Sequence, residues 1–127
     1  MLSKERSRRK VTGGFYKKSR KKKSANLSAL PTFTKVGKVN QLIVKRSKGG
    51  YSKPTMFIAN KINVVDPKTK KFSLTDIVTV VESPANRNFI RRNIITKGSI
   101  VNTKLGKVKV TSRPGQEGFV NGILIKE

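Results

Sequence analysis

The sixty residues from Arg6 to Val65 contain no acidic side chain, although the same stretch carries seventeen lysines and arginines. Over the whole chain, 30 basic residues face 6 acidic ones, which gives a formal net charge of +24. Self-repulsion of this size destabilises a compact domain, and a polyanion that releases its condensed counterions on binding compensates for it. The charge distribution therefore predicts a nucleic-acid-binding protein.

The length and the missing residue types restrict the other classes of function. A chain of 127 residues that is 35% hydrophobic is long enough for one domain with a modest core and a tail. It contains no cysteine and no histidine, and its few carboxylates are scattered, so it lacks the common nucleophiles, general bases and metal ligands. We therefore predict no catalytic residue, no metal site and no cofactor.

Nothing in the sequence suggests a membrane or secreted protein. No apolar run approaches the roughly 20 residues that cross a bilayer. The basic N-terminus has no apolar segment behind it, as a secretory signal would. We therefore expect a cytoplasmic protein.

Residues 1–38 are predicted to form a basic RNA-binding arm that is disordered when free. Their basic residues cluster at 6–10 and 17–23, and no helical or strand periodicity fits the stretch. Ordering a backbone costs about 1 kcal/mol per residue, which the few apolar side chains of this segment do not offset. A simpler interpretation is a solubilising tail or a localisation patch, but the density of charge exceeds what solubility requires.

The segment between the two basic clusters has its own candidate role. Gly13 and Gly14 allow a close approach of the backbone to phosphates, and Phe15 or Tyr16 is available to stack on an unpaired base. Docking of these two rings onto the folded domain is an equally good explanation.

Residues 39–127 are predicted to be mostly β and to form a small six-stranded antiparallel barrel. Short segments rich in Val, Ile and Thr are separated by Gly, Pro and Asn, as is typical of such folds. The expected strands span residues 41–44, 55–65, 71–81, 99–103, 106–111 and 120–125. Residues 66–70 have the composition of a hairpin turn, and residues 104–106 that of a tight one.

Three local patterns in this domain bear on binding. Lys107 to Val110 alternate strictly, which directs the valines inward and the lysines outward. Ser83-Pro84 is a plausible N-cap for one helical turn over 85–88. Arg91 and Arg92, which follow it, either bind phosphates, or lie on a solvated strand or pair with Glu82. The loop 112–118 lacks the ending of a nucleotide-binding loop and is expected to be an ordinary turn.

Several long strings resemble a known family, the archaeal and eukaryotic type of small-subunit ribosomal protein eight. The strings that carry the resemblance are Pro84-Ala85-Asn86, Arg91-Arg92-Asn93-Ile94-Ile95-Thr96-Lys97-Gly98 and Thr111-Ser112-Arg113-Pro114-Gly115-Gln116-Glu117-Gly118. Shorter matches occur in the family's order at Thr12-Gly13-Gly14, Thr34-Lys35-Val36-Gly37 and Gly49-Gly50 with Lys53. The short chain is similar to the archaeal form.

The resemblance implies a structural protein of the small ribosomal subunit, with a β-barrel body and an extended arm. The implied partners are small-subunit ribosomal RNA, in its 5′ domain, and other small-subunit proteins. The chain departs from the family pattern at Ala29-Leu30-Pro31 and at Gly49-Gly50-Tyr51 with the following Thr55-Met56-Phe57-Ile58, where three family arginines are missing. Lysines and arginines between residues 45 and 53 are candidates to replace them.

The predicted RNA-binding residues are basic side chains and two glycines: Arg6, Arg8, Arg9, Lys10, Gly13, Gly14, Lys17, Lys18, Arg20, Lys21, Lys22, Lys23, Lys45, Arg46, Lys48, Lys53, Arg91, Arg92, Lys97, Lys107, Lys109 and Arg113. They are expected to bind the shape of the RNA backbone and not a base sequence. Two alternatives remain open at this point, a ribosome-assembly factor of the same barrel family and a non-specific DNA-compacting protein. An enzyme acting on RNA is disfavoured by the missing histidines and cysteines.

Overall fold

The computed structural model describes residues 2–3, 7–17, 27–28 and 30–125 and divides the chain into two compact units, residues 1–31 and 32–127. In the first unit, β1 (Leu2–Ser3) pairs antiparallel with β2 (Leu27–Ser28). The predicted binding residues Arg6, Lys18 and Arg20, together with Lys21, Lys22 and Lys23, lie outside the described residues.

A closed barrel of five strands forms the centre of the second unit. Its strands are β6 (Lys61–Val65), β7 (Phe72–Glu82), β9 (Ile100–Thr103), β10 (Gly106–Val110) and β11 (Asn121–Leu124), in the order β10-β11-β6-β7-β9. Alternate residues of these strands point inward, so that Ile62, Val64 and Val108 are almost completely buried. Each buried Val or Ile contributes about 1.5–3 kcal/mol of hydrophobic free energy.

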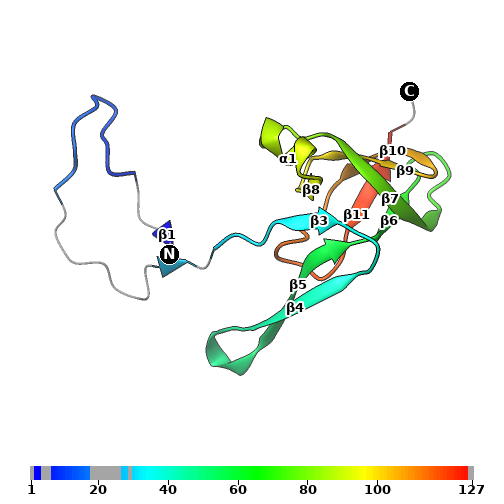
Figure 1. Ribbon diagram of the computed structural model, residues 1–127, viewed down its shortest axis with the longest axis horizontal. Coiled ribbons are helices and arrows are strands. Elements are labelled where there is room, and N and C mark those ends of the chain that lie inside the picture. The colour runs from blue at the N-terminus through cyan, green and yellow to red at the C-terminus, as the bar shows by residue number, and fades with distance from the viewer. Residues whose placement is uncertain (1, 4–6, 18–26, 29, 126–127) are drawn as a thin grey trace. The chain divides into compact units, whose positions relative to one another are not determined.

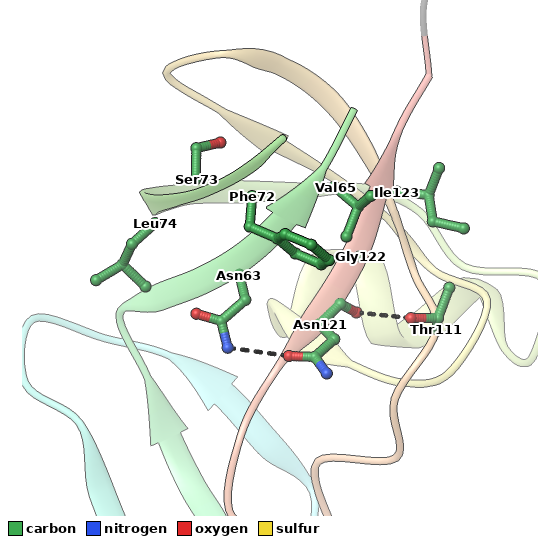
Figure 2. Close-up of a pocket in the computed structure, with 9 residues that line it drawn as sticks. All are labelled: Asn63, Val65, Phe72, Ser73, Leu74, Thr111, Asn121, Gly122 and Ile123. Atoms are coloured by element: carbon green, nitrogen blue, oxygen red, sulfur yellow. Dashed lines mark hydrogen bonds between the residues drawn. The ribbon is translucent and has the colours of Figure 1, made fainter. Parts of the chain in front are cut away.

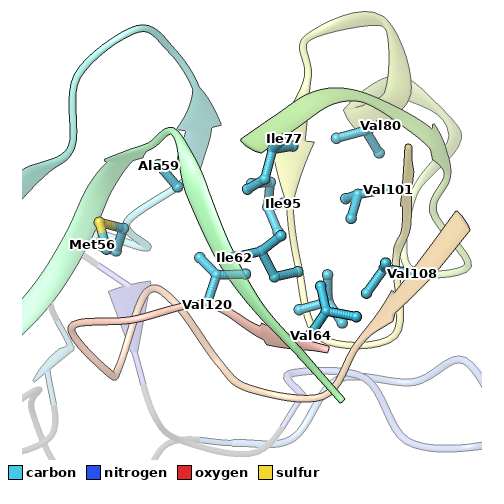
Figure 3. Close-up of a cluster of buried hydrophobic side chains, with 11 residues drawn as sticks. Met56, Ala59, Ile62, Val64, Ile77, Val80, Ile95, Val101, Val108 and Val120 are labelled. Carbon is cyan, nitrogen blue, oxygen red and sulfur yellow. The ribbon is translucent and has the colours of Figure 1, made fainter. Parts of the chain in front are cut away.

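A second sheet shares this core. It contains β4 (Gln41–Arg46), β5 (Ser52–Ala59), β3 (Thr34–Val36) and β8 (Ile94–Ile95), in the order β4-β5-β3-β8. Met56 and Ala59 of β5 join Ile62 and Val120 in one cluster of buried side chains (Figure 3). The β4–β5 hairpin projects beyond this core, with the short 3-10 helix η2 (Lys48–Gly50) at its tip (Figure 1).

The mostly β fold with a small barrel is confirmed, but the barrel has five strands and not six. The strand expected at 41–44 is part of β4, in the second sheet. The strand expected over 55–65 is divided at Asn60, whose backbone N–H donates to Oδ1 of Asn40 at 2.6 Å and whose Nδ2 donates to the Lys38 carbonyl at 2.9 Å. These bonds hold the chain where it passes from one sheet to the other.

The barrel is also not entirely antiparallel, because β6 and β11 pair in parallel. Hairpin turns force antiparallel pairing only between strands that are neighbours in the sequence, and β6 and β11 are far apart. The two predicted turns are confirmed: residues 66–71 connect β6 to β7, and Lys104-Leu105 connects β9 to β10.

The short helix α1 (Arg87–Arg91) exists, but the predicted cap is wrong. Ser83 is buried at the end of β7, and no hydrogen-bond partner for its Oγ is found among the described residues. The N-cap is Asn86, whose side-chain oxygen accepts from the backbone N–H of Asn88 at 2.9 Å. The strand β7 continues to Glu82, so Ser83 directly follows the strand and the helix begins later in the chain.

The loop 112–118 ties the barrel to the second sheet. The backbone N–H of Met56 in β5 donates to the Pro114 carbonyl at 2.9 Å and to that of Glu117 at 3.3 Å. A Cβ atom on Gly115 would lie 2.7 Å from the carbonyl oxygen of Thr32, so only glycine fits there. The loop that was predicted as an ordinary turn therefore also has a packing role.

The boundary between arm and barrel was expected after residue 38. Residues 34–36 form β3, which pairs with β5 and β8, so the second unit already begins at Thr32. The separation into an arm that is disordered when free and a folded barrel domain remains a prediction. Among the described residues, no helix is long and apolar enough to cross a membrane.

Candidate nucleic-acid interface

A small turn organises the predicted RNA-binding residues of the first unit. The backbone N–H of Lys10 donates to the Gly14 carbonyl at 2.8 Å, and that of Tyr16 donates to the Arg8 carbonyl at 2.9 Å. Gly13 has a φ of +85°, a conformation that glycine adopts without strain. Arg8 and Lys17 are exposed, so the turn presents basic side chains to solvent.

Cations lie over both aromatic rings of this turn. The guanidinium of Arg9 is 4.2 Å from the ring centroid of Phe15, and its Nη1 donates to the Gly13 carbonyl at 2.8 Å. The ammonium of Lys10 is 5.5 Å from the ring of Tyr16. Contacts of this kind fix the side chains while leaving the positive charge unneutralised. The rings thus have a role that neither of the two predicted explanations anticipated.

On the β4–β5 hairpin, two lysines from facing strands are held by neutral partners. Lys45 and Lys53 are cross-strand partners. The Nζ of Lys45 donates to Oγ1 of Thr32 at 2.6 Å, and the Nζ of Lys53 donates to Oε1 of Gln116 at 2.8 Å. Arg46 is exposed, and Lys48 lies in η2 at the tip. Lys45 and Lys53 are therefore held in place by groups that do not neutralise their charge.

The helix α1 displays the two adjacent arginines. Arg91 is exposed in its last turn, and Arg92 follows as the C-cap. The guanidinium of Arg92 lies 6.0 Å from the ring of Phe33, which itself packs against Phe89 with the ring centroids 5.5 Å apart. In the part of the chain that the structure describes, neither arginine forms an ion pair with Glu82, so both are available to an external anion.

The barrel adds lysines on its outer face. The predicted alternation over β10 is confirmed, with Val108 and Val110 buried and Lys107 and Lys109 exposed. Lys97 is exposed in the turn before β9. Arg113 is exposed at the start of the loop 112–118, and its backbone N–H donates to Oε2 of Glu117 at 3.4 Å.

One of the few carboxylates is neutralised within the barrel. Asp76 of β7 forms an ion pair with Lys104 in the β9–β10 turn. The hydrogen bond from Lys104, and then the charge of that lysine, hold the pKa of Asp76 below its usual value. Within the described ranges, His, Cys, Asp and Glu form no group of three or more that suits a metal ion.

The predicted binding residues of the second unit do not converge on a single cleft. Figure 1 shows α1 and the tip of the β4–β5 hairpin on different sides of the barrel. A surface with dispersed, fixed cations is suited to contacts with a phosphate backbone at several points, since such contacts set position and register.

Comparison with known proteins decides the family. The family model described as Ribosomal protein S8e matches residues 3–125. The chain belongs to the ribosomal protein S8e family. The resemblance of the strings at 84–98 and 111–118 is thereby confirmed.

Curated members of the S8e family match over almost their whole length. The protein named "Small ribosomal subunit protein eS8" of Methanosphaera stadtmanae is 45% identical over 121 residues, covering 94% of each chain. The protein of the same name from Sulfurisphaera tokodaii is 46% identical over 119 residues, covering 94% of this chain and 93% of its own. That from Methanococcus aeolicus is 48% identical over 124 residues, covering 95% and 94%.

Sequence reasoning missed the residues that hold the cations of this S8e-family chain. Phe33 lies under Arg92, Thr32 accepts from Lys45, and Gln116 accepts from Lys53. Each pair joins residues that are distant in the sequence, so no local pattern marks it. The string 111–118 did carry a signal for Gln116, as part of the family resemblance.

Proposed function

We propose that this chain is a structural constituent of the small ribosomal subunit and binds ribosomal RNA along its phosphate backbone. The proposal rests on the groups that the basic side chains contact. Arg9, Lys45 and Lys53 contact neutral or aromatic groups and not carboxylates, so their charge is oriented but not neutralised. The curated relatives, whose names place them in the small subunit, support the same conclusion.

The two units have different parts in this function. The arm, with its basic clusters at 6–10 and 17–23, neutralises phosphates over a long path. The second unit sets the register through the β4–β5 hairpin, through Arg91 and Arg92, and through Lys97, Lys107, Lys109 and Arg113. Arginine forks at 91 and 92 suit bidentate contacts with phosphate oxygens.

The proposed partners are small-subunit ribosomal RNA, in its 5′ domain, and neighbouring small-subunit proteins. The proposed location is the ribosome in the cytoplasm. We assign the chain a structural and not a catalytic role, as its family membership supports.

The variant Arg91→Ala with Arg92→Ala tests the proposal. We expect it to bind a transcript of small-subunit ribosomal RNA less tightly, with the salt slope reduced by about 0.7–0.9 for each phosphate that the variant no longer binds. The melting temperature should stay close to that of the parent protein, because both side chains are exposed. Binding is measured in the presence of excess duplex DNA.

The matched control changes two other exposed cations, as Lys68→Ala with Lys70→Asn. Both lie in the β6–β7 turn and are not among the predicted RNA-binding residues, and asparagine tolerates the positive φ of Lys70. An equal loss of affinity in both double variants, or complete displacement of the RNA by duplex DNA, would show a general polyanion binder and would contradict the proposal.

A further inference from the structure

An open groove of about 680 Å³ lies on the outer face of the barrel, over β7, β6 and β11 (Figure 2). None of the residues predicted to bind RNA lines it. None of its lining residues belongs to the cluster of buried core side chains, so the groove is separate from the packing that holds the fold together.

Strand pairing arranges the lining in two rows. The first row crosses the strands from Phe72 to Val65 to Ile123 and reaches Lys109 on β10. The second row runs from Leu74 to Asn63 to Asn121. The first row is thus apolar and ends in a cation, and the second brings two amides side by side.

The apolar residues of the two rows are exposed. Phe72 is 80% exposed, Leu74 62% and Ile123 43%. Exposed apolar side chains that lie next to one another in a groove form a candidate surface for binding another molecule. The flat face of Phe72 is suited to stacking.

The amide row leaves hydrogen-bonding groups for a ligand. The Nδ2 of Asn63 donates to Oδ1 of Asn121 at 3.0 Å, and Oγ1 of Thr111 donates to the Asn121 carbonyl at 3.3 Å. Among the described residues, Oδ1 of Asn63 and Nδ2 of Asn121 have no further partner. The pair thus leaves one acceptor, Oδ1 of Asn63, and one donor, Nδ2 of Asn121, for the donors and acceptors on the edge of a nucleobase.

The surroundings favour an anionic occupant. Exposed lysines border the groove at positions 61, 71 and 109. The nearby acid Asp66 is engaged locally, since its Oδ1 accepts from the backbone N–H of Lys68 at 3.0 Å, and Asp76 is paired with Lys104. Flat apolar groups on a negatively charged chain are the chemistry of single-stranded RNA.

We propose that this groove binds an unpaired base of RNA, which stacks on Phe72 and meets the amides of Asn63 and Asn121 with its edge. Lys109, at the end of the apolar row, contacts the adjoining phosphate. The inference rests on the proposed function, because it adds a base site to the backbone contacts. A base held in this way adds a contact to a nucleobase, which the phosphate contacts do not make.

The chain contains no tryptophan, so Phe72→Trp provides a single fluorescent reporter in the groove. We expect short oligo(U) RNA to quench the new indole on binding, because the base stacks against it. An abasic oligonucleotide of equal length keeps the phosphates and should bind without this quenching. Phe119→Trp, at another exposed phenylalanine that does not line the groove, should respond to neither RNA beyond a common small change.

The variant Phe72→Ala gives an independent readout. Its affinity for oligo(U) should fall by about 5- to 150-fold, the range for losing one stacked base, while its affinity for the abasic chain is unchanged. Quenching by the abasic chain equal to that by oligo(U), or an unchanged affinity of Phe72→Ala for oligo(U), overturns the proposal.

The remaining outcomes separate the two proposals of function. If Phe72→Ala binds oligo(U) normally but fails to enter small subunits, the groove is a protein-docking surface and the base site is wrong. If the parent protein binds neither RNA, the proposed function itself fails.

Discussion

At the scale of single residues, the structure holds basic side chains in place without neutralising their charge. Arg9 lies against Phe15, Arg92 against Phe33, and Lys45 donates to Thr32. Hydroxyl and aromatic partners restrict a long side chain but leave its field intact. These side chains have already lost part of their conformational entropy before a polyanion binds. Binding therefore requires a smaller further loss of entropy.

Asp76 is the contrasting residue, and its pKa gives a pH-dependent prediction. A carboxyl group whose pKa is lowered by folding stabilises the native state at any pH above its ordinary pKa of about 3.9. This stabilisation is lost as the pH falls through the lower pKa that the group has in the folded protein. Asp76→Asn should therefore melt slightly below the parent protein at pH 7 and together with it in strong acid. Thermal melts between pH 2 and 7 measure the difference.

Added salt provides the control for this residue. The Lys104–Asp76 pair is exposed, so high salt should shrink the difference at pH 7. A difference that persists unchanged in strong acid would mean that Asp76 acts through packing and not through its charge.

At the scale of elements, the features that were predicted correctly are those formed by residues close together in the sequence. The alternation of Lys107 to Val110 and the turns at 66–71 and 104–105 involve neighbouring residues, and all three were predicted correctly. The division of one predicted strand at Asn60 and the parallel pairing of β6 with β11 were not. They depend on residues distant in the sequence, such as Asn40 and Asn121, whose positions no local pattern reports.

The candidate site follows the same division. Exposed cations such as Lys107 and Arg91 were predicted from composition and alternation, and the structure finds them at the surface. Their partners and the groove at Phe72 were not predicted, because Phe72 becomes a groove residue only when β6, β7 and β11 are paired.

The cap of α1 provides a prediction at this scale. Asn86→Ala removes the side chain that accepts from the Asn88 N–H and should cost about 1 kcal/mol of stability. It should also weaken RNA binding, because α1 carries Arg91. Chemical denaturation and RNA titration measure the two effects.

Ser83→Ala is the matched control for the cap. Its buried Oγ has no hydrogen-bond partner within the described part of the chain, so removing it should leave stability unchanged or slightly raised. If Ser83→Ala is the more damaging substitution, the helix is capped as the sequence first suggested.

At the scale of the whole molecule, charge is divided between a basic arm and a barrel with its own core. The core cluster of Met56, Ile62, Val101 and their neighbours lies entirely in the second unit. We therefore expect the barrel to fold without the first residues of the chain, and we propose that RNA binding draws on their charge.

Deletion of residues 1–23 tests this division. The shortened protein should keep its melting temperature within a few degrees, since the core is intact. Its RNA affinity should fall, and its salt dependence should flatten, because each phosphate contact adds about 0.7–0.9 to the slope. A filter-binding series over salt concentration gives both quantities, and an unchanged slope would mean that the arm does not contact phosphates.

As a member of the S8e family, this protein is expected to be a structural part of the small ribosomal subunit. The most direct measurement is sedimentation of a native lysate through a high-salt sucrose gradient, with the chain quantified against RNA in each fraction. We expect one copy per mature small subunit. Confinement to lighter precursor particles would indicate an assembly factor, and migration with DNA or at the top of the gradient would contradict the ribosomal role.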